Sequence, residues 1–269
     1  MDHLNSVSIL ALYFVAGCAA GFCGGLLGIG GRLVLVPVLA LLFAAQHIAD
    51  PLVMPLALGT SLASIVFTSL SSAHAHHLRG AVDWLLVRRM APGLIVGAAL
   101  GAALSAYCSS GVLKVFFLLF AAAAATQMLF GSQPQAARRL PGAAPLFAVG
   151  GVIAGVASLA GVGGASIAVP FMTWCSVPMR HAIGTASAFG LPIALGGAAV
   201  FVVNGWALTN LPPLSVGFVH LSALAAIVAG SVLAVPPGAA LSHRLPVSAL
   251  KKVFALVMYG VAGEMLATL

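Results

Sequence analysis

Two short motifs rich in glycine are the residues of this chain with the clearest chemical meaning. The first reads GIGGRLVLVP over residues 28–37, and the second reads GVGGASIAVP over residues 161–170. Glycine adopts backbone conformations that interrupt a helix, and the N–H groups at the positive end of a helix bind anions. The motifs therefore predict two helix breaks whose amides face an anion, formed by Gly28, Gly30, Gly31, Gly161, Gly163 and Gly164.

Close helix packing is the alternative for these glycines, because small residues let the backbones of membrane helices approach one another. Arg32 bears on the choice, because an arginine at the bilayer centre costs about 2.5–3.5 kcal/mol on insertion scales and needs a partner or a wet cavity. The second motif has Ala165 in that place. Arg32 is thus a candidate anion ligand of the first break alone, unless its side chain extends to the headgroups.

Hydroxyl side chains follow both motifs in similar stretches. Gly59-Thr60-Ser61 is matched by Gly184-Thr185-Ala186, and a serine comes next. We expect these residues at the starts of the helices after each break. Hydroxyl oxygens there either complete an anion site or cap a helix and bond back to the backbone. The further candidate substrate ligands are Thr60, Ser61, Thr185 and Ser187.

The chain offers little to catalysis or to metal binding. It has four acidic residues, of which only Glu264 lies well inside an apolar segment. An intramembrane hydrolase needs paired carboxylates, or a nucleophile with its base. We therefore predict no catalytic residue, no metal and no cofactor. The histidine cluster resembles metal-ligand spacing only loosely and is expected in a solvated loop, at His74, His76 and His77.

The composition is that of an integral membrane protein. Of 269 residues, 62% are hydrophobic and 6% are charged, whereas soluble domains carry about 25% charged residues. The apolar runs are continuous, which predicts helices and not a β-barrel. The net charge of +7 comes from Lys and Arg in short connections, which indicates topology signals and no nucleic-acid surface. The lipid bilayer is the expected environment, and no cleaved signal peptide is expected.

The apolar pattern divides the chain into eight segments. The first and fifth would each exceed about 50 Å as a single helix, which is longer than a bilayer core, so both must fold back or break. The glycine motifs lie within these two segments. The predicted segments are 7–45, 53–73, 84–107, 112–130, 143–177, 182–203, 214–235 and 248–268.

The matching motifs predict two homologous halves, 1–135 and 136–269, within one membrane domain. Lys and Arg place the loops at 74–89, 131–142 and 236–252 in the cytoplasm, and the loops at 46–52, 108–111 and 204–213 outside. With this orientation the halves are inverted, as in many secondary transporters. The predicted fold is an all-α polytopic membrane protein with two inverted-topology repeats, each a glycine-broken helical hairpin plus three transmembrane helices.

Several stretches together resemble the TauE/SafE sulfite exporter family of bacterial membrane proteins. In the first half they are GLLGIGGRLVLVP, GTSLASIVFTSLSSAHAH, GAVDWLLVRR and GLIVGAALGAAL. In the second half they are GVGGASIAVP, HAIGTASAF and LKKVFALVMYGVAGEML. The resemblance covers nearly the whole chain. It departs from the family at Arg32, where members commonly have another glycine.

The resemblance implies a multi-pass permease of the bacterial plasma (inner) membrane that moves small anions outward, notably sulfite, sulfoacetate and related organosulfur compounds. It makes the glycine breaks, Thr60 and Thr185 candidate ligand contacts. A gated anion channel is the alternative, and a nontransporting membrane enzyme is a more distant one. The sequence leaves open whether the chain forms a homo-oligomer.

Overall fold

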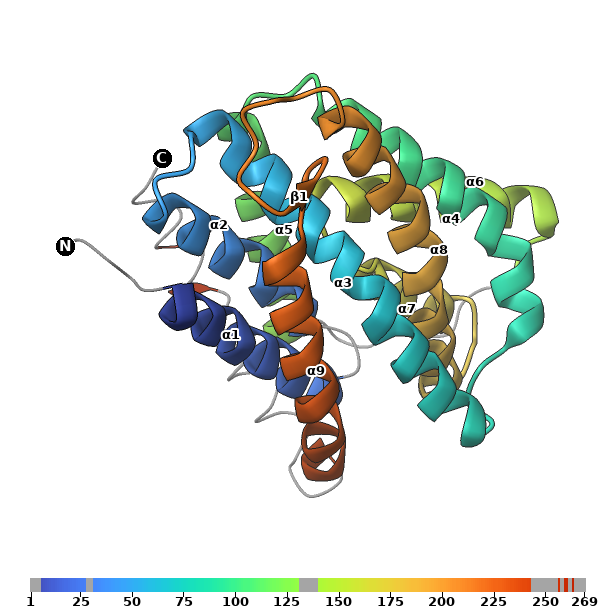
Figure 1. Cartoon of the computed structure of the whole chain (residues 1–269). Coiled ribbons are helices and arrows are strands. Elements are labelled where there is room, and N and C mark those ends of the chain that lie inside the picture. Colours follow the sequence, from blue (N-terminus) through green and yellow to red (C-terminus); the bar gives the residue numbers. More distant parts are fainter. Residues whose placement is uncertain are drawn as a thin grey trace.

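The computed structural model of the chain is built almost entirely from helices (Figure 1). It describes residues 6–27, 31–130 and 140–242, together with positions 256, 259, 260 and 263. The helices of this part of the chain are α1 (Ser6–Leu27), the 3-10 helix η1 (Gly31–Val34), α2 (Leu35–Ala45), α3 (Asp50–Leu78), α4 (Trp84–Ser105), α5 (Ser110–Phe130), α6 (Ala143–Leu159), α7 (Ala165–Trp174), α8 (Met179–Gly205) and α9 (Leu221–Ser242). A small antiparallel hairpin, β1 (Ser215–Val216) and β2 (Val219–His220), precedes α9.

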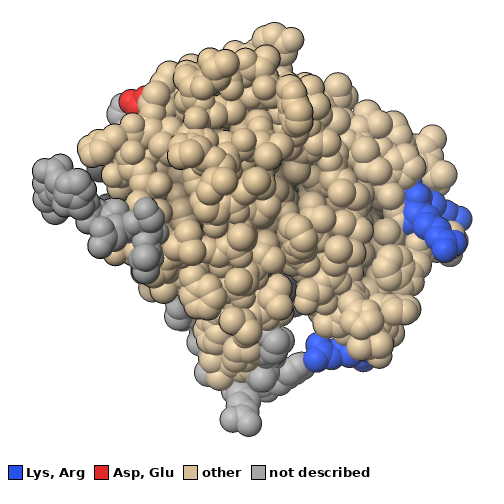
Figure 2. Space-filling model, in the orientation of Figure 1, with Lys and Arg blue, Asp and Glu red and all other residues tan. Residues whose placement is uncertain are grey.

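The helices are apolar enough for a protein that crosses the membrane several times. Four of them have the length and composition to span a bilayer: α3, α4, α8 and the Ser110–Gln127 part of α5. The distribution of charge on the surface is consistent with this. In Figure 2, Lys and Arg lie at one edge of the face and an acidic side chain lies at the opposite edge. Between them this face carries uncharged side chains. These features agree with the predicted all-α polytopic membrane protein.

Both long segments are interrupted at their glycine motifs, as their lengths predict. In the first, α1 ends at Leu27 and α2 begins at Leu35, with η1 between them. In the second, α6 ends at Leu159 and α7 begins at Ala165. Gly28 and Gly30 lie outside the described residues, and so does most of the predicted segment 248–268.

Helices from different halves of the sequence pack against one another. The most extensive contacts join α1 to α9, α4 to α6, α4 to α8, and α3 to α8, with α3 and α8 between the pairs α1–α9 and α4–α6 (Figure 1). Glycines permit this approach: a Cβ on Gly97 of α4 would meet the backbone of Gly151 of α6, and one on Gly21 of α1 would meet the backbone of Ser231 of α9. Small residues in these pairs therefore serve helix packing.

Two side-chain hydrogen bonds identify the two ends of the bundle. Arg180 Nη2, at the start of α8, donates to the carbonyl of Arg79 after α3, at 2.8 Å. At the other end, Ser110 Oγ donates to the carbonyl of Asp50, the first residue of α3, at 2.7 Å. The predicted cytoplasmic loop 74–89 thus lies beside the start of α8, and the predicted outer loops 46–52 and 108–111 lie together.

Two helices are longer than predicted, and this corrects the placement of several polar residues. α3 covers Asp50–Leu78, so Thr60 lies inside the helix and not at its start. Thr185 likewise lies inside α8, which begins at Met179. The loop predicted for the histidine cluster is wrong, because these residues form the last turns of α3. The polar composition of 74–78 suggested a loop, but no Gly or Pro occurs between Gly59 and Gly80 to end the helix.

Candidate functional site

The break between α6 and α7 begins with a left-handed glycine that closes α6. Gly161 has φ of 65°, a conformation that side-chain-bearing residues rarely adopt. Its N–H donates to the carbonyl of Ser158 at 3.0 Å, and the N–H of Val162 donates to the carbonyl of Ala157 at 2.8 Å. These two bonds are the Schellman pattern that satisfies the last carbonyls of a helix. The N–H of Gly161 is therefore already paired within the protein.

The same break ends with a second left-handed glycine that starts α7. Gly164 has φ of 70°, and its carbonyl accepts from the N–H groups of Ile167 and Ala168 at 3.1 and 2.9 Å. The N–H groups of Ala165 and Ser166, in the first turn of α7, have no hydrogen-bond partner among the described residues, and such groups carry partial positive charge. The start of α7, at Ala165, therefore presents donors suited to an anion. Gly163 lies between the two left-handed glycines and is buried.

Two serine side chains add polar groups to this break. Ser61 Oγ of α3 donates to the carbonyl of Gly161 at 2.8 Å, so a helix of the first half holds the break of the second. Ser158 Oγ is fully buried and has no hydrogen-bond partner within the described part of the chain. This hydroxyl packs closely against Gly197 of α8, where an added Cβ would lie only 2.9 Å from Ser158 Oγ. An orphan hydroxyl in a buried break is an available donor.

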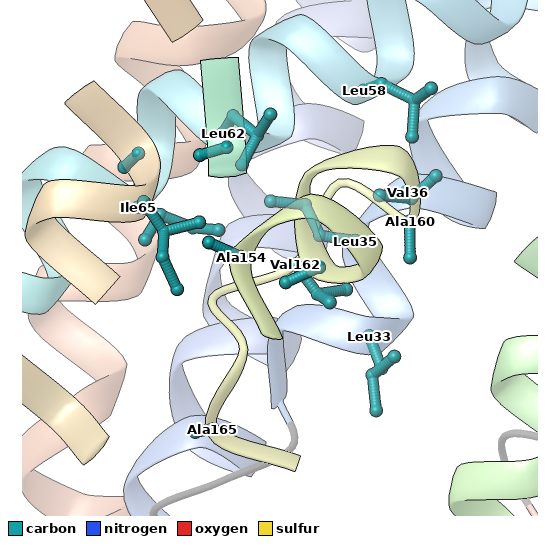
Figure 3. Packing of buried hydrophobic residues seen from close by; sticks show 14 of the residues in the cluster. Leu33, Leu35, Val36, Leu58, Leu62, Ile65, Ala154, Ala160, Val162 and Ala165 are labelled. Carbon is teal, nitrogen blue, oxygen red and sulfur yellow. The ribbon is translucent and has the colours of Figure 1, made fainter. Parts of the chain in front are cut away.

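Helices α2 and α3 lie against the second break. A Cβ on Gly161 would lie 2.8 Å from Val36 Cγ2 of α2 and 2.7 Å from Leu58 Cδ2 of α3. Figure 3 shows apolar side chains of η1, α2 and α3 gathered around the α6–α7 turn, and all of those labelled are buried. Gly31 and Arg32 form the start of η1, which leads directly into α2. Buried apolar side chains of this kind strengthen any polar contact made among them, because the local dielectric constant is low.

Thr60 and Thr185 both accept a hydrogen bond from a backbone N–H of the other half. Thr60 Oγ1 accepts from the N–H of His220, and Thr185 Oγ1 accepts from the N–H of Asp83, each at 3.0 Å. Both threonines are fully buried. Their oxygens thus bind the residues that immediately precede α9 and α4, which is a form of helix capping across the halves.

The glycine before each threonine makes a matching contact. A Cβ on Gly59 would collide with the carbonyl of Phe218, and a Cβ on Gly184 would collide with the carbonyl of Ala81. We call the first set of contacts the α3–α9 junction (Gly59, Thr60, Phe218 and His220) and the second the α4–α8 junction (Ala81, Asp83, Gly184 and Thr185).

The predicted ligands are thus distributed over three places. Ser61, Gly161, Gly163 and Gly164 come together at the second break, whereas Gly31 and Arg32 lie in η1. Thr60 and Thr185 lie in the two junctions. Ser187 Oγ donates to the carbonyl of Gly184 at 2.6 Å, within its own helix, which is the backbone-bonding alternative expected for these hydroxyls.

Three residues of this region were missed by the sequence prediction. Asp83 was noted only as part of a family stretch, and Ser158 and His220 received no role at the site. A signal was present for two of them, because GAVDWL at residues 80–85 and GFVHLS at residues 217–222 share glycine and valine at the same spacing. Ser158 has no such signal, since one serine near a helix end is common.

A separate cavity of about 440 Å³ lies between α3, α4 and α8. It does not include the predicted ligands. Among the described residues no group of three His, Cys, Asp or Glu side chains is arranged to hold a metal ion. The cavity is lined by apolar side chains together with three ring residues, His74, His77 and Trp84.

Residues 13–265 match the family model described as sulfite exporter TauE/SafE. The chain belongs to the TauE/SafE family. It is 36% identical over 269 residues to a probable membrane transporter protein of Haemophilus influenzae, covering 96% of this chain and 98% of that protein. It is 26% identical to the probable membrane transporter protein YdhB of Bacillus subtilis, over 90% and 93% of the two chains. No solved structure matches. This member of the TauE/SafE family is a multi-pass membrane transporter.

Proposed function

We propose that the chain is a permease of the bacterial plasma membrane that exports a small anion. The substrate class is sulfite, sulfoacetate or a related organosulfur or carboxylate anion. The observation that carries this proposal is the second break, where the N–H groups of Ala165 and Ser166 at the start of α7 and the buried Ser158 hydroxyl have no hydrogen-bond partner among the described residues. Backbone amides and a neutral hydroxyl bind an anion without burying a fixed negative charge.

The proposed anion site lies between the two breaks. Gly163, Gly164, the start of α7 and Ser158 supply one side, with Gly161 shaping the turn, and Gly28, Gly30, Gly31 and Arg32 supply the other in this proposal. Ser61 holds the second break in place through its bond to Gly161. Thr60, Thr185 and Ser187 act in the same machinery through the backbone bonds that they make. The low number of acidic residues favours an anion over a cation and a transporter over an enzyme.

We further propose that the halves 1–135 and 136–269 are inverted repeats that move against each other. The reciprocal form of the two junctions supports this: α3 receives the residue before α9, and α8 receives the residue before α4. Opening one junction while the other stays closed would expose the site to one side at a time, which is alternating access. Export follows from the membrane potential, which favours outward movement of an anion by about 2.3 kcal/mol per charge per 100 mV.

Transport by the purified chain in proteoliposomes tests the proposal. We expect saturable efflux of labelled sulfite and counterflow driven by unlabelled sulfoacetate, and slower efflux when the potential is collapsed. Flux that neither saturates nor shows counterflow would indicate the gated channel instead. Absence of flux for sulfite, sulfoacetate and small carboxylates would contradict the proposed substrate class.

Two substitutions locate the site. Ser158→Ala removes one hydrogen bond to a charged ligand, which is worth about 1.5–3 kcal/mol, so we expect KM to rise about tenfold or more with little loss of stability. Arg32→Gly restores the residue common in the family and should change the preference among the anions. Gly142→Ala, at an open position outside the breaks, is the control. Equal KM values in wild type and Ser158→Ala would remove Ser158 from the site.

A further inference from the structure

The two junctions have the same backbone design. Each begins with a left-handed glycine, Gly80 with φ of 65° and Gly217 with φ of 54°. Three residues after each glycine comes the residue whose N–H donates to a buried threonine, which is Asp83 in the first half and His220 in the second. Both residues immediately precede the first residue of a helix.

The side chains of Asp83 and His220 also have the same role. Asp83 Oδ1 accepts from the N–H of Leu86 at 3.0 Å. His220 Nδ1 accepts from the N–H of Ala223 at 3.3 Å, and Ser222 Oγ lies 3.0 Å from the same nitrogen. Each side chain therefore caps its helix by accepting from the N–H three residues later. Because Nδ1 is an acceptor here, the neutral imidazole carries its hydrogen on Nε2.

The residue types differ in how they respond to pH. Aspartate is a preferred N-cap residue, whereas histidine is the side chain whose charge changes nearest to neutral pH. Burial lowers the pKa of the His220 imidazole below its ordinary value of about 6.5. A proton on Nδ1 would remove the acceptor for the Ala223 N–H. It would also place a positive charge at the positive end of α9, where a cation is unfavourable. His220 thus caps α9 only while it is neutral.

We propose that His220 is a proton-binding site that controls the α3–α9 junction. Protonation breaks the cap of α9, which also weakens the bond from the His220 N–H to Thr60, and the junction opens. The α4–α8 junction, capped by Asp83, stays closed through the same range of pH. This inference rests on the proposed movement of the halves, and the predicted topology places the His220 junction toward the outside, where pH varies.

The groups that surround His220 are uncharged. From α1, the Tyr13 ring lies 6.1 Å from the imidazole, and Tyr13 OH accepts from Gln46 Nε2 at 2.6 Å. From α2, the Phe43 ring lies 5.6 Å away. Thr60 Oγ1 of α3 accepts from the N–H of His220, and the carbonyl of Phe201 in α8 accepts from the N–H of Phe218. Tyr13 is the titratable group of this set and is neutral near pH 7, so the added proton meets uncharged neighbours.

Efflux of labelled sulfite from proteoliposomes tests the site, with internal pH fixed and external pH varied from 4.5 to 8, because burial lowers the pKa of His220. We expect the wild-type rate to change about fivefold or more across this range, the factor that loss of one helix cap gives. His220→Asn keeps a neutral acceptor for the Ala223 N–H and should give a flat profile at the high-pH value. His181→Asn, at an exposed position in α8, should keep the wild-type profile. An unchanged profile in His220→Asn would overturn the proposal.

A measurement without substrate separates this proposal from the proposed function. The melting temperature of the purified chain in detergent should fall as pH falls through the imidazole pKa, since protonation breaks the folded-state cap. The fall should be smaller in His220→Asn than in wild type or in His181→Asn. Where His220→Asn folds poorly, His220→Asp installs the cap of the other junction. If the variants differ in the pH dependence of melting but no sulfite flux is found, the proton site stands and the proposed substrate is wrong. If the pH dependence of melting is identical in all variants, His220 is not the proton site.

Discussion

The α3–α9 and α4–α8 junctions use the same backbone contacts but are reached by different connections. The chain enters the α4–α8 junction through the short turn at 79–83, whereas it enters the α3–α9 junction through the longer stretch 206–220, which contains β1 and β2. In both, a helix glycine faces a carbonyl and a threonine oxygen accepts an N–H. What differs is the capping side chain, aspartate in one and histidine in the other.

The shared residues of the two junctions are required by the fold, whereas the capping residues are particular to this chain. The glycine and the threonine are set by geometry, because a carbonyl approaches one and an N–H needs the other, and so they occur at both junctions. The cap needs only an acceptor, and aspartate and histidine both provide one. The two glycine breaks differ in the same way: the glycines are shared, whereas Arg32 has Ala165 as its counterpart.

The largest effect should come from filling the space at the junction glycines. In Gly59→Ala or Gly184→Ala the new methyl group collides with the carbonyl of Phe218 or Ala81, and backbone cannot move aside cheaply. We expect each change to destabilise the protein by about 3 kcal/mol, the upper part of the range for overpacking. The melting temperature in detergent measures this.

Gly24→Ala is the matched control, because this α1 glycine has no atom within 4 Å of an added Cβ. Alanine favours the helix, so the control should melt no lower than wild type. A strong effect at Gly59 with none at Gly184 would mean that the two junctions are not equivalent in packing.

An intermediate effect should follow from removing the threonine oxygens. Thr60→Val and Thr185→Val keep the shape of the side chain but leave the buried N–H of His220 or Asp83 without its acceptor, at a cost of about 2 kcal/mol each. Thr60→Ser and Thr185→Ser retain the oxygen and should restore most of the stability. If valine and serine melt alike at either position, the hydrogen bond contributes nothing there.

Much of the architecture could be predicted from sequence, because it follows from length and periodicity. Segments 7–45 and 143–177 were too long for one helix and contained glycines, and both are interrupted as expected. The ends of α3 and α8 were less predictable, since polar residues such as His76 continue a helix whenever no glycine or proline ends it. The contacts of Thr60 and Thr185 could not be predicted, because their partners lie 160 and 102 residues away.

The chemistry of the breaks was predicted in kind but not in detail. Gly161 was expected to expose its amide, yet the Schellman bond to Ser158 uses that N–H, and the donors left for a ligand are those of α7. Which N–H groups remain unpaired depends on the φ and ψ of each glycine. Glycine leaves both undetermined in the sequence, so only the structure separates a helix-ending glycine from one that starts the next helix.

The smallest effect on stability, and the sharpest test of the comparison, should come from exchanging the two caps. The double variant Asp83→His with His220→Asp keeps an acceptor at both junctions, so its stability at pH 8 should stay within about 1 kcal/mol of wild type. Its response to pH should move to the other junction. In proteoliposomes of known orientation, wild type should respond to the pH on the outer side and the exchanged variant to the pH on the cytoplasmic side.

The single variants Asp83→His and His220→Asp complete this cycle. Asp83→His should respond to pH on both sides, and His220→Asp on neither. Because all four proteins share the same glycines and threonines, a difference between their pH profiles is attributable to the capping residue. If the exchanged variant still responds only to outer pH, the titrating group lies elsewhere, and the difference between aspartate and histidine at the two junctions is a matter of helix capping alone.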